Sequence, residues 1–258
     1  MKPKEYLIKS LKQSVRLLCI TIMLVSTAQA QEFGKVAYGA NHNFGVSIGV
    51  GASQISETID WSHMHGLGNK KNQRFKVGYG LRFTAYSGAN QNYTTAPAIL
   101  TSKQEGPQVL FSETHDENID TISFANVQAN ALNVVIHLQY AITPKLELGF
   151  NIDAVGFCFG GQRTGNFTSS EVYQNPNVNQ KAKPTSFNAL LVSDNDIGTL
   201  NSEIFVRYWL NKKWAIKAGG MFLFTEYTTE NKLTFDNDRF RNKSLLFMIG
   251  TSFKPFNK

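Results

Sequence analysis

The sequence Phe75-Lys-Val-Gly-Tyr-Gly-Leu-Arg-Phe-Thr-Ala85 alternates between two kinds of residue. Its odd positions are apolar or aromatic, and its even positions carry Lys76, Arg82, threonine or glycine. Because successive side chains of a β-strand point to opposite faces, this alternation predicts a strand with one apolar and one polar face. The glycines on the polar face argue mildly against a solvated surface, which has no reason to prefer them.

Six other segments repeat the alternation over nine to eleven residues. They are 44–52, 132–140, 146–154, 200–210, 214–224 and 245–253. The segments 214–224 and 245–253 are apolar on both faces in places, so their facing stays open. Strands of about 9–11 residues can cross a bilayer when tilted, whereas the strands of a soluble domain average about 5–6 residues.

The connections between these segments alternate between short and long. Thr143-Pro144-Lys145 and Asn211-Lys212-Lys213 predict tight turns, while 88–121, 161–197 and 228–242 are long and polar. Short turns on one side and long loops on the other are typical of transmembrane β-barrels. The sequence therefore predicts an all-β protein, a closed antiparallel up-and-down transmembrane β-barrel.

The number of strands follows from a parity argument. A bacterial barrel usually has an even number of strands. If the tight turns face the periplasm, the segment 43–55 runs inward and an outward strand must precede it. Val36–Ala40 is the candidate, which gives eight strands. The assignment leaves 56–72 as a long connection on the side where short ones are expected.

The first thirty residues predict a secretory signal peptide. A basic start is followed by the apolar run Leu17–Val25 and by Ala28-Gln29-Ala30, a small-x-small cleavage site. The apolar run is about half the ~20 residues that a membrane-spanning helix needs. We therefore expect cleavage near Ala30 and a single β-barrel domain over residues 31–258.

Charge and cysteine content narrow the class of protein further. Five of the 26 basic residues and one of the 19 acidic residues lie within 1–30, so residues 31–258 carry a net charge of +3. That small excess speaks against a nucleic-acid partner. Cys158 is the one cysteine of this part, which excludes an intramolecular disulfide. It shares parity with Ile152 and Ala154, so we expect it on the apolar outer face.

Together these features resemble small bacterial outer-membrane β-barrel proteins over residues ~43–256, and the Asn-, Thr- and Phe-rich loops look like envelope proteins of the Bacteroidetes group. Such proteins usually end on an aromatic residue that is recognised during barrel assembly. Here Phe253 and Phe256 are close to the end, although Asn257-Lys258 follow. The resemblance implies outer-membrane lipid and the barrel-assembly machinery as partners. Aromatic residues near the tight turns and the C-terminus predict an interfacial girdle: Tyr140, Tyr208, Trp209, Trp214 and Phe253.

The polar faces of the predicted strands carry charges of both signs. An eight-stranded barrel has an interior just wide enough for side chains, and buried charges persist when they are paired. We therefore expect an interior network of ion pairs that plugs the barrel. Its predicted members are Lys76, Arg82, His137, Glu147, Asp153, Glu203, Arg207 and Lys217.

Histidines are the candidate catalytic or metal-binding groups of the sequence. A three-residue turn places His137 opposite Asn151 and makes Asp153 its diagonal neighbour, an arrangement that suits a general base and equally a satisfied interior histidine. His137 lies near the periplasmic turn, away from an outside substrate. His63-Met64-His65 offers two imidazoles on one side, which do not make a metal site. The sequence predicts no catalytic residue, metal or cofactor.

One loop segment offers a candidate binding surface. The apolar run 186–192 is unusual for a loop and predicts either a strand extension or a patch for a partner or lipid. Two acids follow it with a spacing that does not match a calcium loop. The candidate residues are Phe187, Leu190, Leu191, Asp194 and Asp196.

These expectations favour a non-enzymatic outer-membrane barrel with long loops for structural or binding roles, directed to a surface or cell-wall partner. Three alternatives stay open. A lipid-modifying enzyme of the outer membrane would need a nucleophile beside a base near the outer rim. A small porin would need ten or more strands and an open interior. A soluble periplasmic β-protein would bury the apolar faces and expose the charges.

Overall fold

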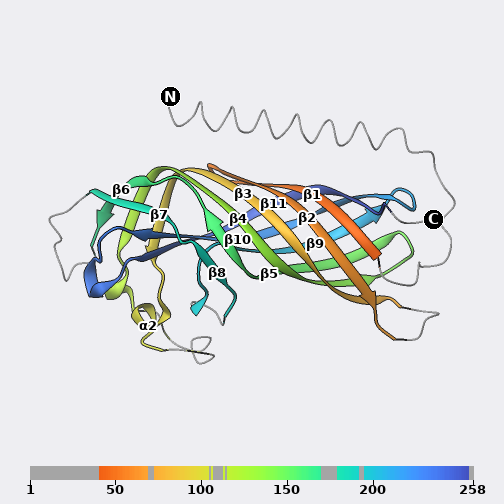
Figure 1. Ribbon diagram of the computed structural model, residues 1–258, viewed down its shortest axis with the longest axis horizontal. Coiled ribbons are helices and arrows are strands. Elements are labelled where there is room, and N and C mark those ends of the chain that lie inside the picture. Colours follow the sequence, from red (N-terminus) through yellow and green to blue (C-terminus); the bar gives the residue numbers. More distant parts are fainter. Residues whose placement is uncertain are drawn as a thin grey trace.

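The computed structural model describes residues 41–68, 73–104, 106, 113, 115–169, 179–191 and 195–255. Long antiparallel strands make up most of it (Figure 1). No helix within the described ranges is long and apolar enough to cross a lipid bilayer. The strands are β1 (Asn41–Gly51), β2 (Gln54–Gly66), β3 (Phe75–Thr95), β4 (Thr121–Ala141), β5 (Leu146–Phe159), β6 (Arg163–Thr168), β7 (Asn179–Pro184), β8 (Phe187–Ala189), β9 (Leu200–Trp209), β10 (Trp214–Thr229) and β11 (Arg239–Phe253), with α2 (Ala98–Thr101), η2 (Asp116–Asn118) and η4 (Thr234–Asp236) between them.

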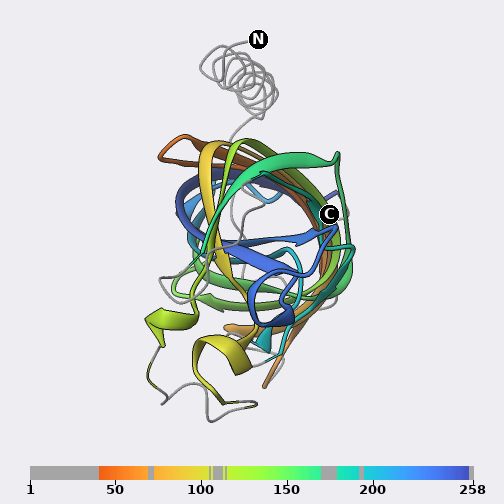
Figure 2. The ribbon, with the colours of Figure 1, turned by 90° about the vertical axis from the view of Figure 1, so that its left-hand side faces the viewer.

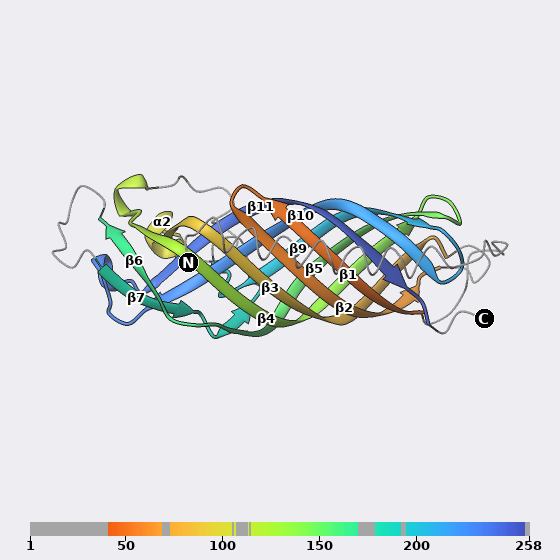
Figure 3. The same cartoon turned by 90° about the horizontal axis from the view of Figure 1, so that it is seen from above.

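The strand pairings close a ring, which confirms the predicted closed antiparallel barrel. Each strand pairs with the next in the order β1, β2, β3, β4, β5, β9, β10 and β11, and β11 pairs back with β1. Figure 2 shows this ring from the end opposite the tight turns that follow β4 and β9, which we call the outer end. Figure 3 shows that the strands are strongly tilted. The tight turns that follow β4 and β9 lie at the same end as the start of β1 and the end of β11.

The first two strands differ from the prediction. The segment 43–55 does not run inward as one strand, because β1 runs outward, turns at Ala52–Ser53 and returns as β2. Ser53 adopts the left-handed conformation that this tight turn needs (φ 57°). Most of β2 falls in the stretch 56–72 that was predicted as a connection, and its outer face carries Glu57, which hides the apolar alternation. The predicted strand Val36–Ala40 lies outside the described residues.

A second, narrower ring stands above the first at the outer end. Here β3, β4, β6, β7, β10 and β11 pair in turn, and β11 returns to β3 through Phe240 and Thr95. The segments 88–121 and 161–197 were predicted as loops, but each contains strand residues of this ring. The polar outer faces of these strands removed the apolar signal that identified the lower barrel. We call this second ring the outer stalk.

Candidate functional site

The interior of the lower barrel is built around Arg82 on β3. Its guanidinium donates hydrogen bonds to Oδ1 of Asp153 on β5, at 2.9 Å from Nε and 2.6 Å from Nη2. Nη1 forms an ion pair with Oε1 of Glu203 on β9 at 3.1 Å. All three side chains are buried. One cation therefore binds two carboxylates that come from other parts of the wall.

Lys217 on β10 continues the network across the lumen. Its Nζ lies 3.5 Å from Oε2 of Glu203 and 3.5 Å from Oδ1 of Asp60 on β2. Asp60 was not among the predicted members, because β2 was not predicted as a strand. The signal that could have found it is the alternation of Ser56, Thr58, Asp60 and Ser62, all of which are buried inside.

A second group of charges lies nearer the end of the barrel that carries the tight turns after β4 and β9. Glu147 on β5 accepts from Nζ of Lys76 at 3.2 Å and from Nη1 of Arg207 at 3.3 Å. Lys254, one residue beyond β11, packs its Nζ 3.8 Å from the ring centroid of Trp209. Trp209 was predicted in the outer girdle, and this prediction is wrong. Its side chain is buried inside the barrel and covers this lysine.

His137 is joined to the network through an amide. The strand register pairs it with Asn151, and its Nδ1 lies 2.8 Å from Asn151 Oδ1. The Asn151 amide donates to Oε2 of Glu203 at 3.2 Å. Asp153 is instead bound by Arg82, by the Asn133 amide at 2.7 Å and by the backbone N–H of Asn201 at 2.9 Å. These contacts engage Asp153 elsewhere, so that the side chain in hydrogen-bond contact with His137 is the Asn151 amide rather than a carboxylate.

The charges of this network balance. Four cations and four carboxylates take part in the buried ion pairs, so the cluster is neutral without His137 or Lys254. Removing charge from water is costly, and mutual attraction offsets that cost when each member is paired. We call this set the charge network. Its members in ion pairs are Lys76, Arg82, Arg207, Lys217, Asp60, Glu147, Asp153 and Glu203.

An aromatic layer fills the lumen above the charge network. Tyr93, Phe124 and Tyr227 contact one another with ring centroids 5.2–5.3 Å apart. The hydroxyl of Tyr93 lies 2.7 Å from that of Thr225 on the facing strand, and the hydroxyl of Tyr227 donates to the carbonyl of Gln128 at 2.8 Å. Side chains of the outer stalk therefore pack as a core, and the barrel is closed at two levels.

The outer face shows the opposite composition. Leu245 and Phe247 on β11 are 71% and 65% exposed, whereas Arg82 is 1% exposed. Tyr140, Tyr208 and Trp214 lie at the strand ends beside the tight turns, the positions expected for them from the sequence. Trp214 also packs against Phe253 of β11, with ring centroids 4.5 Å apart.

Cys158 was predicted on the outer face, but its side chain does not lie there. It is buried, and its thiol lies 3.4 Å from the hydroxyl of Thr199. The register between β4 and β5 shifts between Val134 and Val135, where Val134 pairs with Val155 and Val135 with Asp153. This bulge reverses the facing of the following residues, so that Phe157 is exposed and Cys158 points inward.

The loop candidates form part of the wall. Phe187 starts β8, pairs with Phe157 of β5 and is exposed, as is Leu191, whereas Leu190 is half-buried. Asp196 is buried, with Oδ1 accepting the N–H of Leu191 at 2.7 Å. Asp194 lies outside the described residues. Among the residues that the structure describes, no group of three or more His, Cys, Asp and Glu is placed to hold a metal ion.

A further buried ion cluster lies on the outer stalk and was not predicted. Glu226 on β10 pairs with Arg239 at 2.8 Å and with Arg241 at 2.8 Å. Both guanidinium groups also donate to the backbone carbonyl of Asp196. The cluster therefore fastens the end of the 187–197 segment to β11. Its sequence signal, a glutamate facing arginines on a paired strand, requires the register to be known.

Taken together, the pairings and side chains define a closed β-barrel with an apolar exterior and charged side chains in its interior. No protein-family model matches the sequence, and no curated protein matches it. Among solved structures, the chain is similar to the Yersinia pestis outer membrane protein Ail, at 11% identity and a TM-score of 0.34 over 83% of this chain and 99% of that one. It is also similar to Neisserial surface protein A, at 7% identity and a TM-score of 0.35 over 83% and 95%. The fold of this chain is defined by its own strand pairings.

Proposed function

We propose that the protein is a non-enzymatic β-barrel of the bacterial outer membrane, closed to solute flow, that presents its outer stalk and loops for binding. The observation that carries the proposal is the inverted side-chain distribution. Large apolar residues such as Leu245 and Phe247 face outward, while charged residues such as Arg82 and Glu203 are fully buried. Lipid stabilises such an exterior, whereas water does not.

The height of the apolar exterior supports the same location. On β4 the outward side chains from Leu132 to Tyr140 are apolar or aromatic and exposed. Nine residues at roughly 3.3 Å each, tilted by about 40°, rise about 23 Å, close to the ~25 Å apolar band of outer-membrane barrels. The exposed residues Asn92 and Ser123 of the outer stalk are polar, as expected above a membrane.

The filled lumen supports a structural or binding role over transport. Arg82 bridges to Glu203 and Lys217 to Asp60 across the barrel, and the aromatic layer lies above them. A porin needs a continuous aqueous path, which these contacts obstruct. An outer-membrane hydrolase needs an oriented base near the outer rim, and His137 is bound by an amide within the lower barrel.

The proposal includes several expectations from the sequence. Residues 1–30 direct export and are removed near Ala30, and the barrel-assembly machinery inserts the remainder. The composition of the loops supports an origin in the Bacteroidetes group. The surface around Phe187 and Leu191, both exposed, is proposed to contact outer-membrane lipid or a partner at the cell surface or cell wall.

Fractionation tests the location. The full-length chain is expressed in a Gram-negative host, outer membranes are isolated, and boiled and unboiled samples are compared by gel electrophoresis. Enrichment in the outer membrane with a mobility shift on boiling is expected. An Ala28→Arg/Ala30→Arg variant, which disrupts the cleavage site, should accumulate as a larger precursor. Release of the wild-type chain as a soluble periplasmic protein would overturn the proposal.

A further inference from the structure

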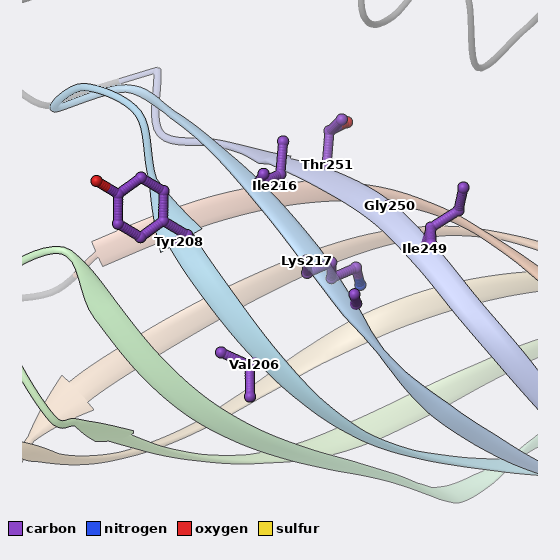
Figure 4. Close-up of a pocket in the computed structure, with 8 residues that line it drawn as sticks. Val206, Tyr208, Ile216, Lys217, Ile249, Gly250 and Thr251 are labelled. Carbon is purple, nitrogen blue, oxygen red and sulfur yellow. The ribbon is translucent and has the colours of Figure 1, made fainter.

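A shallow apolar groove crosses the outer face of the barrel where β9, β10 and β11 lie side by side (Figure 4). Its volume is about 360 Å³. Two cross-strand rows form it: Tyr208, Ile216 and Thr251 make the lower row, and Val206, Ala218 and Ile249 make the upper row.

The groove exists because β10 presents small residues outward. Ala218 lies between two branched side chains of the neighbouring strands, and the next outward residue of β10 is Gly220. On either side along β10, Ile216 and Phe222 are large and exposed. These two small residues leave an apolar depression on the wall, which Ile216 and Phe222 bound along β10.

The lower end of this groove changes from apolar to aromatic to cationic within a few residues. Below Ile216, Trp214 packs against Phe253 with the two rings tilted at 35° to each other. The turn that joins β9 to β10 then carries Lys212 and the exposed Lys213. The neighbouring turn adds the exposed Lys145, whose carbonyl accepts the N–H of Trp209 at 2.8 Å.

We propose that this groove binds an anionic phospholipid of the periplasmic leaflet, with an acyl chain along Ala218 and the phosphate at Lys212 and Lys213. The inference rests on the proposed membrane location. Charge complementarity identifies the occupant: lysines beside a membrane attract anionic headgroups, and tryptophan marks the depth at which headgroups lie. The charge network inside the wall is neutral, so its paired charges do not oppose this attraction.

Lipid retention tests the proposal. The purified full-length protein is reconstituted into nanodiscs of phosphatidylcholine with a minor fraction of phosphatidylglycerol, extracted gently, and analysed by native mass spectrometry. Ala218→Trp fills the groove. Val134→Trp adds the same side chain to the outer face of β4 and serves as the control, because Val134 is also exposed. Wild type and V134W should retain phosphatidylglycerol, and A218W should lose it roughly tenfold or more.

The headgroup contact is tested separately. K212Q/K213Q should lower the preference for phosphatidylglycerol over phosphatidylcholine roughly fivefold for each lysine removed, and K232Q, in the loop after β10, should leave it unchanged. Equal retention by A218W and V134W would overturn the proposal. So would equal retention of the two lipids by wild type, release of lipid by millimolar inorganic phosphate, which indicates a simple anion site, or a dimer that A218W alone dissociates. Failure of every variant to show heat-modifiable mobility would instead contradict the membrane location.

Discussion

Arg82 and Glu203 meet across the lumen, with Nη1 and Oε1 3.1 Å apart, although β3 and β9 are not neighbours in the ring. Glu203 also holds Lys217, which in turn reaches Asp60 on β2. The Arg82–Glu203 and Lys217–Asp60 contacts connect strands that do not pair with each other, whereas Lys217 and Glu203 lie on the paired strands β10 and β9. The charge network therefore acts as a set of internal struts between strands that are not neighbours.

Removing Glu203 should destabilise the barrel strongly. E203A leaves Arg82 and Lys217 each with one carboxylate fewer in a buried site, and breaking such a pair typically costs about 3–5 kcal/mol. The free energy of unfolding is measured in urea after refolding into lipid vesicles. The matched control is E117A, because Glu117 pairs with Lys103 at 3.9 Å on the surface, and exposed pairs contribute about 0–1 kcal/mol. Equal losses for both variants would contradict the strut role.

Conductance distinguishes the closed barrel from a small porin. The wild-type protein in a planar bilayer should show no stable ion conductance. E203A should also stay closed, because Tyr93, Phe124 and Tyr227 fill the lumen above it. A variant that combines E203A with Y93A and Y227A removes side chains from both layers and is expected to leak. Steady conductance through the wild type would show that the lumen opens.

The outer stalk should loosen independently of the lower barrel. Phe124 is buried against Tyr93 and Tyr227, and truncating such a residue typically costs about 3–5 kcal/mol. F124A should therefore speed hydrogen exchange in β6, β7 and the upper half of β4, while the residues near Arg82 stay protected. The exposed Leu132 on β4 provides the control variant L132A, which should leave exchange in the stalk unchanged. Uniform deprotection of the whole chain by F124A would show that the two rings unfold as one unit.

Lys254 should titrate near neutral pH. It lies just beyond β11, burial lowers its pKa to about 7, and attraction to Glu147 opposes that shift. The pKa of a lysine in the unfolded chain is about 10.4. Below about pH 7 Lys254 is charged in the folded and in the unfolded chain, and the cost of burying its charge is present in full. Between about pH 7 and 10.4 the lysine binds a proton in the unfolded chain but not in the folded one. The free energy of unfolding therefore rises with pH over this range.

The measurement is an NMR titration of labelled lysines, with Lys254 assigned by loss of its signal in K254R. E147Q should move the midpoint lower, because it removes the attraction that favours the charged form. A midpoint in the ordinary range of lysine would contradict the buried placement of this side chain.

Thiol labelling tests the bulge in β5. Cys158 should resist a membrane-permeant maleimide in the folded barrel and react after unfolding, because it is buried against Thr199. The control is F157C in a C158S background, since Phe157 is exposed on the outer face. Rapid labelling of Cys158 with protection at position 157 would place the register of β5 one residue away.

The sequence predicted those strands whose two faces differ clearly in polarity. Phe75–Ala85 has apolar residues at every odd position, and β3 contains it with the predicted facing. β2 was missed because Glu57, His63 and His65 lie on its outer face and break the pattern, and Asp60 was missed with it. The predicted facing of side chains on β5 was also wrong beyond the register shift at Val134. A single extra residue in a strand exchanges the inward and outward positions that follow it, and nothing in the local sequence marks it.

The interior residues were predictable as a set but not as pairs. A charge on the polar face of a membrane strand must point inward, which identifies Arg82 and Glu203 without knowledge of register. The partner of each depends on how β3 and β9 are placed across the ring, which composition does not specify. Trp209 shows the same limit: its place at a strand end suggested an outer girdle, while its parity turned it toward Lys254.

The continuity of the outer stalk with the barrel has a mechanical consequence. β3, β4, β10 and β11 each run without interruption from the lower barrel into the second ring. A load applied at the outer tip, for instance by an attached surface, would be transmitted along these strands as shear across many hydrogen bonds at once. A contact made there would be anchored against traction, whereas the same contact on a flexible loop would first pull the loop taut.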